Sequence, residues 1–404
     1  MKLPFRTAIF WLHLATGIVA GSIVLIMSVT GVLLMYERQI VEWADRGLRP
    51  VPPAPGAARL PVETLLGKAA AFHPGATVSS LTIQADPAAP AQVGLGRERT
   101  LFVDPYSGEI LGEGSPTVRA AFHRITDWHR WLGAGEEGRD EGRKVTGACN
   151  LAFLFLVISG LYLWVPRKWT RQQVRNVAWF RGGLSARARD FNWHNTIGLW
   201  IWLPLFVIVL SGVFISYPWA GDLLLRLSGE EVTPRRSEGP GSGPGRKPEG
   251  GGPRGDGDRR AEVSLDGFDE LWAQAERKVV GWQSISLRLP SSPEAPVTFT
   301  ILRGGRGRPD LRAQLTLDRA SGEEKTWQTY ASQGVGRRVR AWMRWLHTGE
   351  AGGWIGQTIA GLASAGAAVL VWTGLALSWR RFFSRRKTSS QASPQPSEIS
   401  EGVL

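Results

Sequence analysis

The sequence predicts an α-helical membrane bundle of four transmembrane helices that carries two small α+β units outside the membrane. Two observations support this fold class: four apolar runs are separated by polar segments, and the order of elements in the first half of the chain recurs in the second. A helix of roughly 20 apolar residues crosses the hydrocarbon core of a bilayer. The four runs meet this length and cover residues 7–36, 145–165, 192–217 and 354–379.

The charge distribution predicts how these helices are oriented. The chain has a formal net charge of +13, and most of the excess lies before the first run, in the loop 166–191 and in the tail 380–404. Short segments rich in Lys and Arg stay on the cytoplasmic side of multi-pass proteins. We therefore expect both termini in the cytoplasm. The basic segments are expected to contact anionic membrane lipid, and no nucleic-acid partner is expected.

The long segments 37–144 and 218–353 are then expected on the opposite side of the membrane. Each contains a helix pattern, two strand patterns and a hairpin. In the first unit, residues 61–115, these are predicted at 61–72, 78–84, 92–95 and 100–112. In the second unit, residues 262–330, they are predicted at 265–279, 282–289, 296–302 and 314–324. The Gly/Pro/Arg segment 234–260 lies before the second unit and is expected to be disordered.

The two halves also share residues at a constant spacing. An offset of 214 positions relates Asp104 to Asp318 and Trp128 to Trp342. An aspartate at the start of such a turn usually caps its own backbone. We expect a tandem duplication of one unit, in which a spanning helix is followed by an α+β unit, a Trp-rich segment and a second spanning helix.

The histidines are the candidate functional residues. His13 and His194 lie near the same end of the first and third runs, and each is followed by a glycine four residues later. His129 and His347 lie just before the second and fourth runs, at the opposite end. A polar, ionisable side chain at such a depth is costly unless it has a partner. We expect one histidine per spanning helix, paired at two levels.

Paired histidines on facing helices can supply both axial ligands of a haem iron. The sequence therefore predicts two haem b groups, one held by His13 and His194 and one by His129 and His347. Covalent attachment is not expected, since the single cysteine, Cys149, lies in an apolar run and no Cys-x-x-Cys-His motif is present.

Other interpretations of these histidines stay open. Each could be an inter-helix hydrogen-bonding group, and a zinc site is a weaker option because no cysteine cluster accompanies them. The duplication is imperfect at the outer pair: the 214-position offset places Met343 opposite His129, and His347 opposite Gly133. His123 is an alternative outer ligand or a propionate partner. His73 is expected to be a surface residue.

Several short motifs, in their order along the chain, resemble the PepSY-associated transmembrane helix family. They are Trp11-Leu12-His13 with Gly31, the hairpin Phe102–Glu109, Trp128–Leu132, Asn192–Asn195 and Trp345–Gly349. The resemblance implies a protein of the bacterial inner membrane with two PepSY-like periplasmic modules. Better-understood relatives are ferric-siderophore reductases with b-type haems, which implies an oxidoreductase and axial roles for His13, His194, His129 and His347.

These expectations combine into a transmembrane electron-transfer protein that reduces a ferric siderophore or a similar iron complex on the periplasmic side. The sequence has no Gly-x-Gly-x-x-Gly fingerprint for a dinucleotide. The electron donor is therefore expected to be external, either a quinol or a partner flavoprotein. The alternative is a non-redox, membrane-anchored PepSY protein that binds a ligand or regulates a peptidase.

Overall fold

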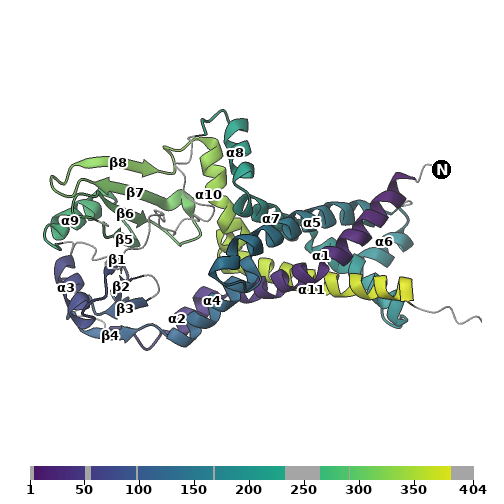
Figure 1. The fold of residues 1–404 in the computed structure, drawn as a ribbon, viewed down its shortest axis with the longest axis horizontal. Helices are drawn as coiled ribbons and strands as arrows, with labels where there is room; N and C mark the ends of the chain where they lie inside the picture. Colours follow the sequence, from purple (N-terminus) through teal and green to yellow (C-terminus); the bar gives the residue numbers. More distant parts are fainter. Residues whose placement is uncertain are drawn as a thin grey trace, which may run out of the picture.

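The computed structural model describes residues 4–50, 56–96, 99–166, 169–232, 264–290 and 292–383. The Gly/Pro/Arg segment predicted at 234–260 and the part of the predicted tail from 384 onward lie outside the described residues. The molecule is elongated, with a helical bundle at one end and a β-sheet flanked by helices at the other (Figure 1).

Four helices of the described chain are long and apolar enough to cross a membrane, as predicted. The spanning helices are α1 (Phe5–Met35), α5 (Arg139–Trp164), α7 (Ala186–Ser216) and α11 (Gly353–Phe383). Helix α1 packs against α5 and α11, and α7 packs against the same two helices. The chain is thus a multi-pass membrane protein. Helices α5 and α7 begin six residues before the predicted starts because polar first turns extend them beyond the apolar runs.

The bundle exposes large apolar side chains and buries small residues, in contrast to a soluble protein. Large apolar side chains such as Val19, Leu203 and Leu362 are exposed on its outer surface. Small residues such as Ala360, Ala363 and Ala367 are buried between the helices. Because lipid is as apolar as leucine, helices in a membrane associate through close packing at small residues. The sequence pattern of α11 follows this rule.

Eight strands within the described residues form one antiparallel sheet in the order β4-β3-β2-β1-β5-β6-β7-β8. The strands are β1 (Val78–Gln84), β2 (Ala91–Leu95), β3 (Arg99–Val103), β4 (Ile110–Glu113), β5 (Ser284–Arg288), β6 (Val297–Leu302), β7 (Arg312–Leu317) and β8 (Glu324–Thr329). Strand β1 pairs with β5, and Leu81 lies opposite Leu287. The two predicted units are therefore joined. The pairing covers β1 and β5, each of which would otherwise be an exposed edge strand of its unit.

Helices α3 (Val62–Phe72) and α9 (Phe268–Lys278) lie against the sheet at its end away from the bundle (Figure 1). The two helices have the same length and bury the same four positions, counted from their first residue. In α3 these are Val62, Leu65, Leu66 and Ala69, and in α9 they are Phe268, Leu271, Trp272 and Ala275. They form one apolar core with the inward side chains of the strands.

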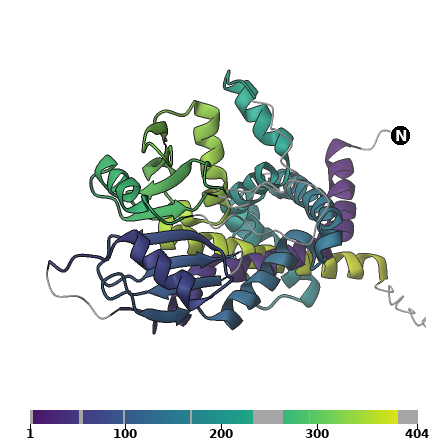
Figure 2. The same cartoon turned by 60° about the vertical axis from the view of Figure 1, so that its left-hand side comes forward.

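Further helices connect the sheet to the bundle, and these were not predicted. They are α2 (Glu37–Ala44), α4 (Pro116–Trp131), α8 (Pro218–Leu227) and α10 (Val335–His347). Figure 2 shows the same arrangement from the side. Helix α4 begins with Pro116 in its first turn and ends at Trp131, and the two residues that follow, Leu132 and Gly133, both have positive φ. His129 and His347 thus lie on α4 and α10, the helices that precede the second and fourth spanning helices, α5 and α11.

Candidate functional site

Four histidine side chains meet in two pairs inside the bundle. His13 on α1 and His194 on α7 lie within electrostatic range of each other, far from the sheet. His129 on α4 and His347 on α10 face each other near the sheet, with ring centroids 6.3 Å apart and ring planes at 59°. On α1, His13 and the residue that contacts His129, Thr30, are separated by 17 positions. This spacing puts the two levels about 25 Å apart along the helix.

Three of the four imidazoles are held at Nδ1 by a hydroxyl on a neighbouring spanning helix. His13 Nδ1 lies 2.8 Å from Ser159 Oγ on α5. His129 Nδ1 lies 2.9 Å from Thr30 Oγ1 on α1. His194 Nδ1 lies 3.0 Å from Thr373 Oγ1 on α11. Each ring is therefore oriented by a helix other than its own.

The direction of these hydrogen bonds follows from the hydroxyl groups. Ser159 Oγ donates its own hydrogen to the carbonyl oxygen of Phe155 at 2.6 Å, and Thr373 Oγ1 donates to Val369 at 2.8 Å. Thr30 Oγ1 likewise donates to Ile26 at 2.7 Å. A hydroxyl has one hydrogen, so with that hydrogen on the backbone carbonyl each of these oxygens accepts from the imidazole. The neutral rings carry their proton on Nδ1, and the Nε2 lone pair is free.

His347 reaches the same state by a different contact. Its Nδ1 lies 2.9 Å from the carbonyl oxygen of Ile208, which can only accept a hydrogen bond. Ser211 Oγ on α7 is 3.4 Å away and donates to the same carbonyl. The proton again lies on Nδ1. The fourth histidine therefore also presents an unprotonated Nε2.

Glycines beside the hydroxyl residues leave space for the rings. A Cβ added at Gly160 would lie 3.4 Å from Cε1 of His13, and one at Gly374 would lie 3.4 Å from Cε1 of His194. This is tighter than most real contacts of a Cβ. A larger residue at either position would displace the ring from its hydroxyl partner. At Gly212, which follows Ser211, the neighbouring side chain is that of Asn150 and not a histidine ring.

The spacing of the His129–His347 pair suits two imidazoles on opposite sides of one metal ion. With imidazole–metal bonds of about 2.0 Å, two axial rings have centroids about 6 Å apart, and the 6.3 Å between His129 and His347 fits this value. Nδ1 hydrogen bonds of this kind fix the ring orientation and increase the basicity of the ligand. Among the described residues, no group of three or more His, Cys, Asp or Glu side chains could hold a metal ion.

The other two histidines lie outside the pairs. His123 is on the exposed side of α4, six residues before His129, and lies within electrostatic range of Glu37. His73 ends α3 and its Nε2 lies 2.6 Å from Oε1 of Glu113. Neither ring contacts the His129–His347 pair through any hydrogen bond that the structure shows.

Sequence reasoning missed the hydroxyl residues, although a signal for them exists. A Ser-Gly or Thr-Gly dipeptide occurs in each spanning helix: Thr30-Gly31, Ser159-Gly160, Ser211-Gly212 and Thr373-Gly374. Thr30-Gly31 and Ser211-Gly212 lie at the opposite level from His13 and His194, because a residue 17 or 18 positions along a helix is at its other end.

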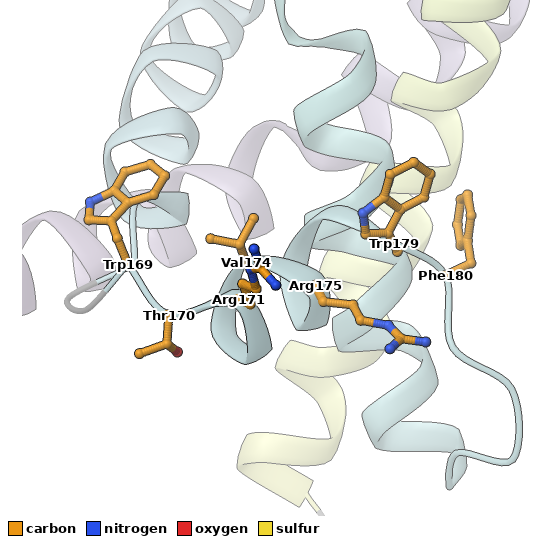
Figure 3. Close-up of a pocket in the computed structure, with 7 residues that line it drawn as sticks. All are labelled: Trp169, Thr170, Arg171, Val174, Arg175, Trp179 and Phe180. Carbon is orange, nitrogen blue, oxygen red and sulfur yellow. The ribbon is translucent and has the colours of Figure 1, made fainter.

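A separate hollow of about 550 Å³ lies at the end of the bundle away from the sheet. It is lined by residues of α6 (Arg171–Ala178) and of the segments on either side of this helix, within the loop predicted at 166–191. Figure 3 shows its lining, which combines aromatic rings with arginine side chains: Trp169, Thr170, Arg171, Val174, Arg175, Trp179 and Phe180. Tryptophan and arginine are enriched where a protein meets the membrane surface.

The chain was compared with curated proteins and with models of protein families. A search of curated proteins finds no match. The family model described as the PepSY-associated TM region matches residues 10–381, a range that begins just before His13 and ends in the last turns of α11. Because this match spans nearly all of the chain, the protein belongs to the PepSY-associated transmembrane family.

Proposed function

We propose that this protein carries electrons across a bacterial inner membrane through two b-type haems and delivers them to a ferric chelate on the periplasmic side. The observation that carries the proposal is the state of the four histidines: each is held at Nδ1 and presents Nε2 inside the bundle. Structural histidines that only join helices do not need a free Nε2 paired with another.

Each pair of histidines would bind one haem. His13 and His194 would hold one haem, and His129 and His347 the other, each haem supplying a site that gains and loses one electron. Ser159, Thr373 and Thr30 keep their imidazoles in the ligating tautomer. With levels about 25 Å apart, the two haems would lie near opposite ends of a crossing of about 30 Å.

The orientation of the bundle in the membrane rests on charge. The described basic residues Arg171, Arg175, Arg187 and Arg380 are all at the end of the bundle away from the sheet. By the positive-inside rule this end is cytoplasmic, which puts the sheet in the periplasm. An external donor, a quinol or a flavoprotein, would reduce the His13–His194 level. The chelate would meet the His129–His347 level.

The symmetric strand order supports a tandem duplication as the origin of the fold. The order is symmetric about the β1–β5 pair, and α3 and α9 bury equivalent positions. We infer that each half is a PepSY-like module with its spanning helices.

The test is a reduced-minus-oxidised spectrum of the detergent-purified protein, with haem quantified per chain. We expect two haems in the wild type and one in a His13→Ala/His194→Ala variant. The same loss is expected for His129→Ala/His347→Ala. The controls are His123→Ala and His73→Ala, which should keep both haems. A wild-type protein without haem, after expression with ample haem, would overturn the proposal and favour a non-redox, membrane-anchored binding protein.

A further inference from the structure

The two faces of the sheet have opposite character. One face contains fully buried side chains such as Leu81, Leu287 and Phe299, which pack against α3 and α9. The strand register puts the alternate residues on the second face. One row across this open face links Thr82, Ser286, Thr300 and Gln314 through consecutive strand pairs.

Hydroxyl and amide side chains dominate the open face. At the β3–β4 edge this face is covered, because Phe102 is buried and Arg119 lies over its ring. Elsewhere the register gives these outward positions: Ser80, Thr82, Gln84, Gln92, Gly94, Thr100, Ser284, Ser286, Arg288, Thr298, Thr300, Leu302, Arg312, Gln314, Thr316, Thr326 and Gln328. None of these described positions is Asp or Glu. The only charged residues among them are arginines. Such a face offers many hydrogen-bond donors and no negative charge.

Three arginines gather at one end of this face. Arg312 begins β7, Arg306 lies in the loop before it, and Arg344 lies on α10. In the part of the chain that the structure describes, none of the three has a carboxylate within 4.0 Å. Partial burial, followed by the positive charges of Arg344 and Arg306, lowers the pKa of Arg312. Glu37 and Glu350 act on Arg344 from a greater distance.

This end of the sheet adjoins the histidine pair near the sheet. Arg344 and His347 lie three residues apart on α10, so they occupy adjoining turns. The loop that carries Arg306 also contacts the start of the last spanning segment, since a Cβ at Gly307 would lie 2.3 Å from the carbonyl oxygen of Glu350. The arginines therefore lie between the open face and the His129–His347 pair.

We propose that the open sheet face and Arg306, Arg312 and Arg344 bind an anionic, oxygen-rich ferric chelate of the carboxylate or hydroxycarboxylate class. This inference rests on the proposed function, for which it specifies the substrate. Guanidinium groups bind carboxylates through paired, charge-assisted hydrogen bonds. The hydroxyl and amide groups match the remaining oxygens. A ferric chelate of net positive charge would be repelled.

The chelate would accept one electron from the reduced level held by His129 and His347. Ferric iron becomes ferrous, the donor level is oxidised by the same one electron, and no bond to the protein forms or breaks. The ferrous ion then has lower charge density, which weakens its bonds to hard oxygen donors.

Binding can be measured separately from electron transfer. Gallium(III) citrate has the charge and ligands of an anionic ferric chelate, and it is not reduced under these conditions. Calorimetric titration of the full-length protein in detergent should show binding that weakens with added salt. In Arg312→Gln/Arg344→Gln we expect affinity to fall about tenfold or more, because the charge-assisted hydrogen bonds to the chelate are lost.

The matched control is Arg277→Gln, an exposed arginine on α9, at the end of the sheet away from the bundle. It should bind as the wild type does. Equal affinity for a cationic gallium trihydroxamate, or unchanged affinity in the double variant, would overturn the proposal. Haem content should be normal in all variants, which separates this result from the proposed function: a wild type with two haems that does not bind gallium citrate refutes the substrate assignment alone.

Discussion

Glu63 and Asp269 exchange hydrogen bonds across the junction of the two units. Oδ1 of Asp269 accepts from the backbone N–H of Glu63 at 3.1 Å, and Oε1 of Glu63 accepts from the backbone N–H of Asp269 at 3.3 Å. Both residues lie in the first turns of their helices, where N–H groups have no partner inside the helix. Each carboxylate therefore caps the other helix and meets the positive end of its dipole.

Removing one carboxylate should weaken the helix that it caps. For Glu63→Ala we expect the free energy of local opening of α9 to fall by about 1 kcal/mol, the usual cost of a lost helix cap, while α3 keeps the cap from Asp269. Hydrogen–deuterium exchange of the amides in α3 and α9 measures this change. The control is Glu270→Ala, an exposed residue one position after Asp269.

A double-mutant cycle sharpens this prediction. Because the two carboxylates act on each other's backbone, Glu63→Ala/Asp269→Ala should cost less than the sum of the single changes. Strictly additive effects would show that each carboxylate acts alone.

The centre of the joined sheet should be sensitive to a loss of volume. Leu287 is fully buried and lies opposite Leu81 in the strand pair that joins the two units. Leu287→Ala should lower the free energy of unfolding of the sheet by about 2–5 kcal/mol. Denaturant unfolding, followed by tryptophan fluorescence, tests this. A change below 1 kcal/mol would mean that β1 and β5 do not share a core.

The sequence was sufficient to predict elements that depend on local pattern. The bounds predicted for β1 agree with the structure, and the helix of the first unit differs by a single residue. The spanning helices followed from uninterrupted apolar runs, because no other element of this length satisfies its backbone in lipid. Their ends were less accurate, since charged turns such as that at Arg139 continue a helix without an apolar signal.

Features that depend on contacts distant in sequence could not be predicted. The pairing of Leu81 with Leu287 joins residues more than 200 positions apart, and neither strand signals its partner. The same limit applies to the histidines. Their positions suggested two levels, but the partners Ser159 and Thr373 lie on other helices. A serine in an apolar run more commonly bonds its own helix, so its second role as an acceptor is visible only in the folded bundle.

The Ser159 hydroxyl should set the properties of the level held by His13. In Ser159→Ala, Nδ1 of His13 loses its acceptor, so the ring becomes a weaker and less oriented ligand. We expect affinity for haem at this level to fall by about 10- to 100-fold. The midpoint potential of the haem that still binds at the His13 level should rise, because a less basic imidazole stabilises the ferric state less. Redox titration followed by absorbance measures both effects.

Two controls accompany this change. Ser159→Thr keeps the hydroxyl and should restore most of the affinity. Ser22→Ala removes an exposed hydroxyl from α1 and should leave the spectrum and potential as in the wild type. If Ser159→Ala titrates like Ser22→Ala, the hydrogen bond to His13 has no role in cofactor binding.

Gly374 offers a graded test of the space around His194. A Cβ at this position would lie 3.4 Å from Cε1 of the ring, so Gly374→Ala should shift the ring by a few tenths of an ångström and change the potential while haem is retained. Gly374→Leu places further carbons where the ring lies, and one haem per chain should be lost. Gly17→Ala is the control, since its nearest neighbour would be Leu156 at 4.0 Å. Because the two levels are about 25 Å apart, the haem that remains in Gly374→Leu should keep the spectrum of the His129–His347 level. A loss of both haems, with the protein still folded, would show that the two levels do not bind independently.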